Sequence, residues 1–237
     1  MPAPPPKDDA VLRRFQKLID RAAWPDEPQA ASDVARVRTQ VNLYRRALPF
    51  LEQSGWLRSA EAKRSIDAKG RPVPWYTYPA IAFLAEKDFA QLSVFEFGSG
   101  GSTMWWAARA KHVTAVEHAL EWVEEVRPQL PANVDYLYEA LTENGPYSRA
   151  ALTSGRSYDI VVVDGRDRVN CAVNSLPALT PAGVLVWDNA HRGRYREGYE
   201  MVMAQGFRRL NLHGMTPING APSLTSIFYR DGNCLGI

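Results

Sequence analysis

A glycine-rich turn lies between an apolar segment and a helical pattern near the middle of the 237-residue chain. It reads Val94-Phe95-Glu96-Phe97-Gly98-Ser99-Gly100-Gly101-Ser102. Glycines let the backbone approach a ligand closely, and a helix that begins there offers free N–H groups to a carboxylate or phosphate. Glu117 ends the next β-rich segment, where an acidic side chain can accept hydrogen bonds from a ribose diol. Together these residues predict a nucleoside site, and a tight structural turn is the alternative.

Polar residues that follow two later apolar segments form a second candidate site. Asp164 follows Ile160-Val161-Val162-Val163, and Asp188 with Asn189 follows Val184-Leu185-Val186-Trp187. If both segments are parallel strands, these residues meet at the carboxyl edge of the sheet, where such folds bind ligands. Three oxygen donors suit Mg²⁺, so we expect Asp164, Asp188 and Asn189 to hold a divalent cation. The alternative is that Asp164 orients the nucleoside ligand while Asp188 and Asn189 cap a helix.

Neighbouring residues add candidates for proton transfer and substrate binding. His191 can act as a general base or lie in a surface loop as a hydrogen-bonding residue, and Asp167 is the other candidate base. Asp164 is a further candidate catalytic residue. Arg166 and Arg168 can clamp an anionic substrate or lie in a solvated turn. The segment Pro74-Trp75-Tyr76-Thr77-Tyr78-Pro79 gathers three aromatics. We expect it to close over the ligand, with Tyr76 in contact, or to pack an N-terminal cap onto the sheet.

Strands that alternate with helices must position these residues. Apolar, β-rich runs predict strands at 94–97, 113–116, 134–138, 160–163, 184–187, 207–212 and 224–229, with helices at 79–88, 103–110 and 120–126 between or before them. The loop between the last two runs is too short for a crossover helix, so that pair is antiparallel. The pattern predicts an α/β fold with a doubly wound, mostly parallel, seven-stranded sheet and a terminal antiparallel hairpin.

The N-terminal third has a different pattern. Apolar residues recur at helical spacing over 8–23 and 32–54, and Pro49 can kink or split the second helix. We expect residues 1–75 to form a tail and a helical cap, and residues 76–237 to form one Rossmann-like domain.

Charge and composition limit the class of protein. Residues 1–75 hold 14 Lys and Arg against 9 Asp and Glu, a net charge of +5, within an overall +2. These arginines follow helical patterns, which favours a solvated helix face over a nucleic-acid surface. No run of about 20 apolar residues predicts a membrane span, and two cysteines without ligand spacing indicate idle thiols in a cytoplasmic protein.

These motifs resemble the class I S-adenosylmethionine-dependent methyltransferases over about residues 76–230. The matching stretches are E-F-G-S-G-G-S, A-V-E-H, Y-D-I-V-V-V-D-G and P-A-G-V-L-V-W-D-N. Matched position by position, the resemblance implies a cofactor site with three parts. The methionine part would contact Glu96, Gly98, Ser99, Gly100 and Ser102. The ribose would contact Glu117 and His118, the adenine would contact Glu139 and Ala140, and Asp164 would also contact the cofactor. Ser102 replaces a common third glycine, which implies a changed loop shape. The strand ends at Asp164 and at Asp188-Asn189 are also similar to those of the cation-dependent O-methyltransferases.

The resemblance implies methyl transfer from S-adenosylmethionine to a small-molecule acceptor, at oxygen. Methylation of RNA or protein and a non-catalytic protein that keeps the fold are alternatives, and a homodimer stays open. A nicotinamide-dependent oxidoreductase is disfavoured, because Thr103 stands where G-x-G-x-x-G needs glycine.

Overall fold

The computed structural model describes residues 28–237, and the helix expected at 8–23 lies outside these residues. Helix α2 (Pro28–Gln53) is one continuous element with Pro49 inside it, so the proline does not split the helix. Residues 50–237 form one compact unit, and the part of α2 before Phe50 belongs to another. Among residues 28–237, no helix is both long and apolar enough to cross a membrane.

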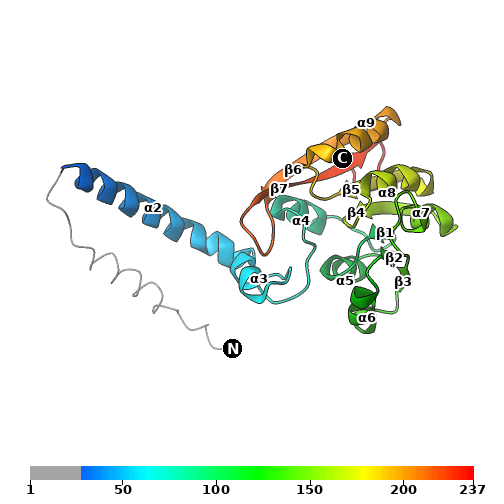
Figure 1. Cartoon of the computed structure of the whole chain (residues 1–237), viewed down its shortest axis with the longest axis horizontal. Coiled ribbons are helices and arrows are strands. Elements are labelled where there is room, and N and C mark those ends of the chain that lie inside the picture. Colours follow the sequence, from blue (N-terminus) through cyan, green and yellow to red (C-terminus); the bar gives the residue numbers. More distant parts are fainter. Residues whose placement is uncertain (1–27) are drawn as a thin grey trace. The chain divides into compact units, whose positions relative to one another are not determined.

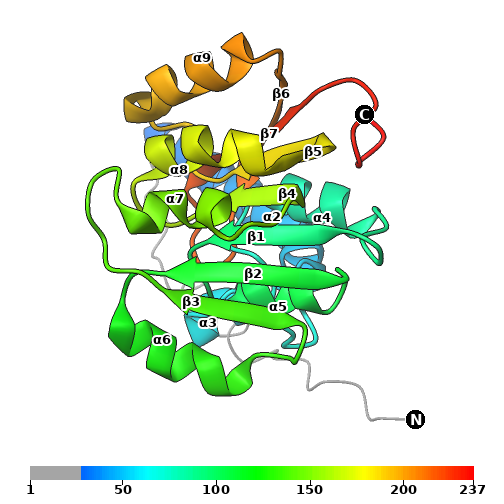
Figure 2. The same cartoon turned by 90° about the vertical axis from the view of Figure 1, so that its right-hand side faces the viewer.

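The compact unit is built on a seven-stranded sheet in the order β3-β2-β1-β4-β5-β7-β6. Figure 2 shows β3, β2, β1 and β4 side by side in this order. The strands are β1 (Ser93–Phe97), β2 (His112–Glu117), β3 (Val134–Tyr138), β4 (Tyr158–Val163), β5 (Leu179–Trp187), β6 (Arg208–Met215) and β7 (Pro222–Tyr229). The first five are parallel, and β7 pairs antiparallel with both β5 and β6.

The predicted fold is therefore confirmed, including the terminal antiparallel hairpin expected from the short loop between the last two strands. No ranges were predicted for four helices, α3 (Trp56–Ala62), α7 (Pro146–Thr153), α8 (Arg168–Ser175) and α9 (Arg196–Ala204). The other differences lie at element ends. Strand β5 begins five residues before the expected start, and α5 (Gly101–Ala107) begins inside the glycine-rich turn.

Helices cover both faces of the sheet, because alternate strand residues point to opposite faces. Phe95 and Phe97 of β1 belong to a core under α7 (Pro146–Thr153), α8 (Arg168–Ser175) and α9 (Arg196–Ala204). These three helices lie in a row (Figure 1). Val94 of β1 belongs to the opposite core, under α4 (Tyr78–Ala85) and α5, while α6 (Leu120–Val126) packs on β2 and β3. This three-layer arrangement fixes the carboxyl ends of the parallel strands, where the candidate residues lie.

The segment before the sheet is tied to the terminal hairpin. Trp56 in α3 (Trp56–Ala62) donates from its indole N–H to the carbonyl of Asn219 at 3.1 Å. Thr77 caps α4 through Ala80 N–H and donates from its hydroxyl to the carbonyl of Leu212 at 2.9 Å. Trp56 therefore holds the loop between β6 and β7, and Thr77 holds β6 at the edge of the sheet.

Candidate functional site

A cavity of about 550 Å³ opens at the carboxyl edge of the parallel strands. The loops after β1, β2, β4 and β5 line it, together with Trp75 and the loop between β6 and β7. Its lining includes these predicted site residues: Gly98, Ser99, Ser102, Glu117, His118, Asp164, Asp188, Asn189 and His191. The topology thus brings both candidate sites of the sequence into one cavity.

The loop between β1 and α5 needs glycine where the backbone passes close to its neighbours. Gly98 has φ of 97°, and a Cβ there would lie 3.2 Å from the carbonyl oxygen of Asp164. Gly100 has φ of 143°, a conformation that residues with a side chain rarely adopt. Glycine therefore lets the backbone turn at Gly100 and lets the loop pass close to the end of β4 at Gly98.

Glu96 lies beneath this loop and is fully buried. Its Oε2 accepts a 2.5 Å hydrogen bond from the hydroxyl of Thr103, and its Oε1 has no partner within residues 28–237. Burial raises the pKa of Glu96 to about 8, because the charged form loses its hydration. An unpartnered buried oxygen of this kind is costly and commonly indicates a ligand or a proton.

Glu117 ends β2 with its carboxylate already oriented by the backbone. Its Oε1 accepts from the N–H groups of His118 at 2.8 Å and Ala119 at 3.1 Å. Its Oε2 accepts from the hydroxyl of Ser99 at 3.1 Å, and that hydroxyl also lies 2.6 Å from the phenol of Tyr136. A carboxylate can accept about four hydrogen bonds. Glu117 therefore keeps accepting capacity for a ribose hydroxyl, and a diol can replace Ser99 as donor.

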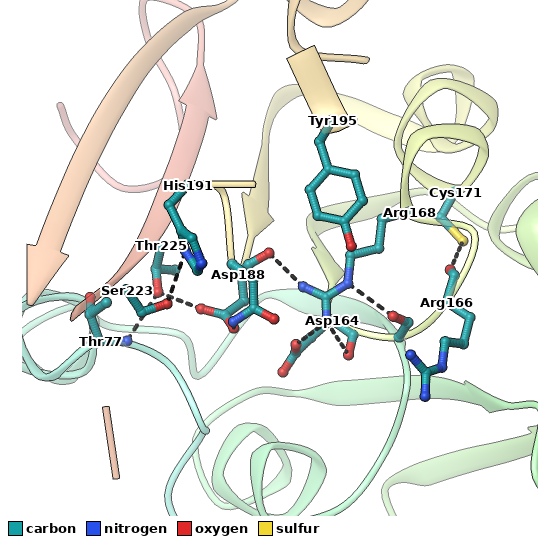
Figure 3. A network of polar contacts seen from close by, with 12 residues as sticks. Thr77, Asp164, Arg166, Arg168, Cys171, Asp188, His191, Tyr195, Ser223 and Thr225 are labelled. Carbon is teal, nitrogen blue, oxygen red and sulfur yellow. Dashed lines mark hydrogen bonds and ion pairs between the residues drawn. The ribbon is translucent and has the colours of Figure 1, made fainter. Parts of the chain in front are cut away.

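Three charged residues interact at the ends of β4 and β5 (Figure 3). The guanidinium of Arg168 donates to Oδ1 of Asp164 at 2.9 Å and to the carbonyl oxygen of Asp188. The Asp188 side chain is buried, and its Oδ1 accepts from the hydroxyl of Thr225 at 2.7 Å. Its Oδ2 accepts from the amide of Asn189 at 2.6 Å. Burial, and next the charge of Asp164, raise the pKa of Asp188.

These contacts do not support the expected Mg²⁺ site. Arg168 already supplies a positive charge to Asp164, and Asn189 offers its N–H₂ group to Asp188. Across the described residues, no group of three His, Cys, Asp or Glu is arranged to hold a metal ion. Asp164 Oδ1 and both Asp188 oxygens already accept from protein donors, so this arrangement gives the Mg²⁺ site no support. The positive charge that was expected from a metal ion is supplied to Asp164 by a guanidinium from α8.

Two residues were expected to act as bases, and they lie in different surroundings. His191 lines the cavity, and its Nδ1 lies 3.4 Å from the hydroxyl of Ser223. Partial burial, and next the charge of Arg192, lower the pKa of His191. Asp167 is absent from the lining, and its carboxylate accepts from Asn144 N–H at 2.9 Å and from the amide of Asn170 at 2.8 Å. Of the two, His191 is the better placed to take a proton in the cavity.

Five predicted cofactor residues are not part of the cavity lining: Tyr76, Glu96, Gly100, Glu139 and Ala140. Tyr76 is fully buried, and its hydroxyl accepts from Trp106 at 3.3 Å, so in this structure it packs the core. Glu139 donates from its backbone N–H to the carbonyl of Glu117 at 3.0 Å. The neighbouring Trp75, in contrast, lines the cavity and donates to Thr216 at 3.3 Å.

Sequence reasoning did not find several residues around the cavity. Trp122 of α6 donates from its indole N–H to the carbonyl of Ser99 at 3.0 Å and so supports the glycine-rich loop. Thr225 and Ser223 alternate along β7, a spacing that places both on one face of the strand. The cluster of hydroxyl residues Ser223, Thr225 and Ser226 among the apolar residues of this strand was the available signal.

Comparisons with known proteins give likenesses of fold. No family model matches the chain, and no curated protein matches it. It is similar to a precorrin-6y C5,15-methyltransferase from Geobacter metallireducens, with 13% identity, a TM-score of 0.48, and coverage of 63% of this chain and 85% of that one. It is also similar to a methyltransferase-like protein from Silicibacter pomeroyi, with 22% identity, a TM-score of 0.47 and coverage of 67% and 89%. An N-methyltransferase from Bradyrhizobium japonicum in complex with S-adenosyl-L-homocysteine has 14% identity, a TM-score of 0.44 and coverage of 59% and 78%.

Proposed function

We propose that this chain is a class I methyltransferase that transfers a methyl group from S-adenosylmethionine to an oxygen atom of a small molecule. The observation that carries the proposal is one cavity lined by both the glycine-rich loop and Glu117, with a potential base at its other side. The motif resemblance supports the same reading, and the cavity volume suits a nucleoside with part of a small acceptor.

Glu117 would hold the ribose hydroxyls of the cofactor, and the loop at Gly98 and Ser99 would approach its methionine part. The buried Glu96 lies directly below this loop and favours a positively charged ligand nearby, since such a charge stabilises its ionised form. S-adenosylmethionine, when bound, supplies an electrophilic methyl group on a sulfonium ion. The contribution of the chain is then mainly positioning, which can account for much of the rate of a displacement reaction.

His191 would remove the proton of the acceptor hydroxyl. Its Nδ1 faces Ser223, so Nε2 is the nitrogen that can accept the proton. The lowered pKa of His191 keeps the imidazole neutral near pH 7, which is the form that a base requires. With the cofactor bound as methyl donor, His191 would accept the proton that the acceptor hydroxyl loses on methylation.

Binding of S-adenosylmethionine or S-adenosylhomocysteine tests the proposal directly. Calorimetry should give saturable binding, and Glu117→Ala should weaken it roughly ten- to a hundredfold, because hydrogen bonds to a charged group contribute about 1.5–3 kcal/mol. Glu121→Ala is the matched control, since Glu121 is an exposed acid on α6 outside the cavity. Binding of NADH in place of S-adenosylmethionine would contradict the proposal.

A further inference from the structure

A second cavity of about 360 Å³ adjoins the first, and we call it the arginine cavity. The two share Gly165, Arg166, Arg168 and Arg192 in their linings. The arginine cavity is lined by these three arginines and Arg194, against one acidic residue, Asp167. It therefore lies next to the proposed reaction centre and has an excess of positive charge.

The arginines differ in how their charges are balanced. Arg168 is held by Asp164 and by two strand-end carbonyls. Arg166, Arg192 and Arg194 have no carboxylate within 4.0 Å in the part of the chain that the structure describes. Asp167 supplies one negative charge to this lining against four arginines, and its two oxygens accept from the Asn144 backbone N–H and the Asn170 side-chain amide. These three guanidinium groups keep donor capacity for a ligand, although Arg194 already donates to the phenol of Tyr195.

The pKa of Tyr195 shows the effect of these positive charges. Its phenol is buried at the wall of the arginine cavity and accepts from Arg194 at 3.0 Å. Burial alone would raise the pKa of Tyr195, but the Arg194 hydrogen bond and the charge of Arg168 lower it instead. The environment stabilises a negative charge enough to overcome the cost of desolvation.

We propose that the arginine cavity binds an anionic group, a carboxylate or a phosphate, on the methyl acceptor. The proposal rests on the proposed function and names its substrate class. Arg166 follows the end of β4 and Arg192 follows the end of β5, so both guanidinium groups start from the edge that holds Asp164 and His191. Planar guanidinium groups bind carboxylate and phosphate through paired hydrogen bonds. An anion held there would fix the acceptor with its hydroxyl towards His191.

The test uses the full-length chain saturated with S-adenosylhomocysteine, so that the carboxylate of the cofactor is already bound. Inorganic phosphate and acetate are titrated separately by calorimetry at constant ionic strength. We expect saturable binding of at least one anion, and the tighter of the two identifies the acceptor group. Arg166→Gln and Arg192→Gln should each weaken it about tenfold, as expected for loss of a charge-assisted hydrogen bond. Arg196 is exposed at the start of α9 and lies outside both cavities, so Arg196→Gln should leave the affinity for the anion unchanged.

Several outcomes would overturn the proposal. These are no saturable anion binding, unchanged affinity in the Arg166→Gln/Arg192→Gln double variant, or an equal loss in Arg196→Gln. Displacement of the anion by S-adenosylhomocysteine would assign the arginines to the cofactor instead. Arg192→Lys keeps the charge and serves as a second variant if the glutamine variant unfolds, and it should retain part of the affinity. If phosphate binds through Arg192 but S-adenosylhomocysteine does not bind at all, the anion site stands and the proposed methyltransferase function falls.

Discussion

Replacing Arg168 by methionine tests whether this side chain is the cation that keeps Asp164 and Asp188 together. Methionine fills a similar volume, but it removes the positive charge and every hydrogen bond that the guanidinium makes to the ends of β4 and β5. We expect the free energy of unfolding to fall, because two carboxyl groups would share this edge without a compensating charge.

The expected magnitude follows from the burial of the ion pair. The side chain of Arg168 is 8% exposed and that of Asp164 is 20% exposed. Removing one partner of a buried pair costs about 3–5 kcal/mol, and the partial exposure of Asp164 favours the lower end, about 3 kcal/mol. For a domain of this size, that corresponds to a fall in melting temperature of about 6–12 °C.

The loss should also depend on pH. Without Arg168, the pKa of Asp164 rises further above its value in the unfolded chain, so the folded state binds more protons than the unfolded state. The free energy of unfolding then falls as pH rises, and the deficit relative to the wild type should be larger at pH 8 than at pH 5. Thermal unfolding followed by circular dichroism at both values measures this.

A double variant separates charge from packing. Arg168→Met/Asp164→Asn removes the uncompensated charge and should recover at least half of the lost stability at pH 8. If the single variant melts at the wild-type temperature, or loses the same amount at both pH values, Arg168 does not act as the compensating cation.

Three further predictions concern the buried acid, the base and one glycine. Glu96 has a pKa of about 8 in the folded chain, above its unfolded value, so the free energy of unfolding of the wild type should fall between pH 5 and pH 8. Thermal unfolding of Glu96→Gln should show a smaller fall over this range. An unchanged pH dependence in the variant would contradict this role of Glu96. His191→Gln should lower kcat by about 10²- to 10⁴-fold. The wild-type pH–rate profile should have its acid limb below pH 6.5, and the wild-type enzyme should keep its turnover in excess chelator. Loss of turnover in chelator would support the metal site instead. Gly165→Ala should destabilise the fold by about 1–3 kcal/mol, because its Cβ would lie too close to the hydroxyl of Tyr147. Gly193→Ala is the control and should leave stability unchanged, since open space surrounds Gly193. Equal denaturation midpoints for the two variants would refute the steric argument.

The architecture could be predicted because its signals are local. Uninterrupted β-branched runs such as Ile160–Val163 require cover on both faces, and the short connection before β7 leaves no room for a crossover helix. Element ends were harder to predict, as in β5, where Thr180, Pro181 and Ala182 do not resemble a strand but extend it by pairing within the sheet. Tertiary contacts decide such positions, not local preference.

The site could be predicted only as far as the sheet topology determines it. Glu117, Asp164 and Asp188 had to meet because they end parallel strands, and their meeting required a compensating charge. Which group supplies that charge depends on how the chain turns after β4: Asp167 adopts a left-handed conformation, and α8 begins there with Arg168 one turn from Asp164. A guanidinium introduced by the next helix needs no external ion, and it leaves Arg166 and Arg192 without a carboxylate partner. The turn after β4 therefore supplies a positive charge to Asp164 and also places Arg166 on the arginine cavity, in which we propose that an anionic acceptor binds.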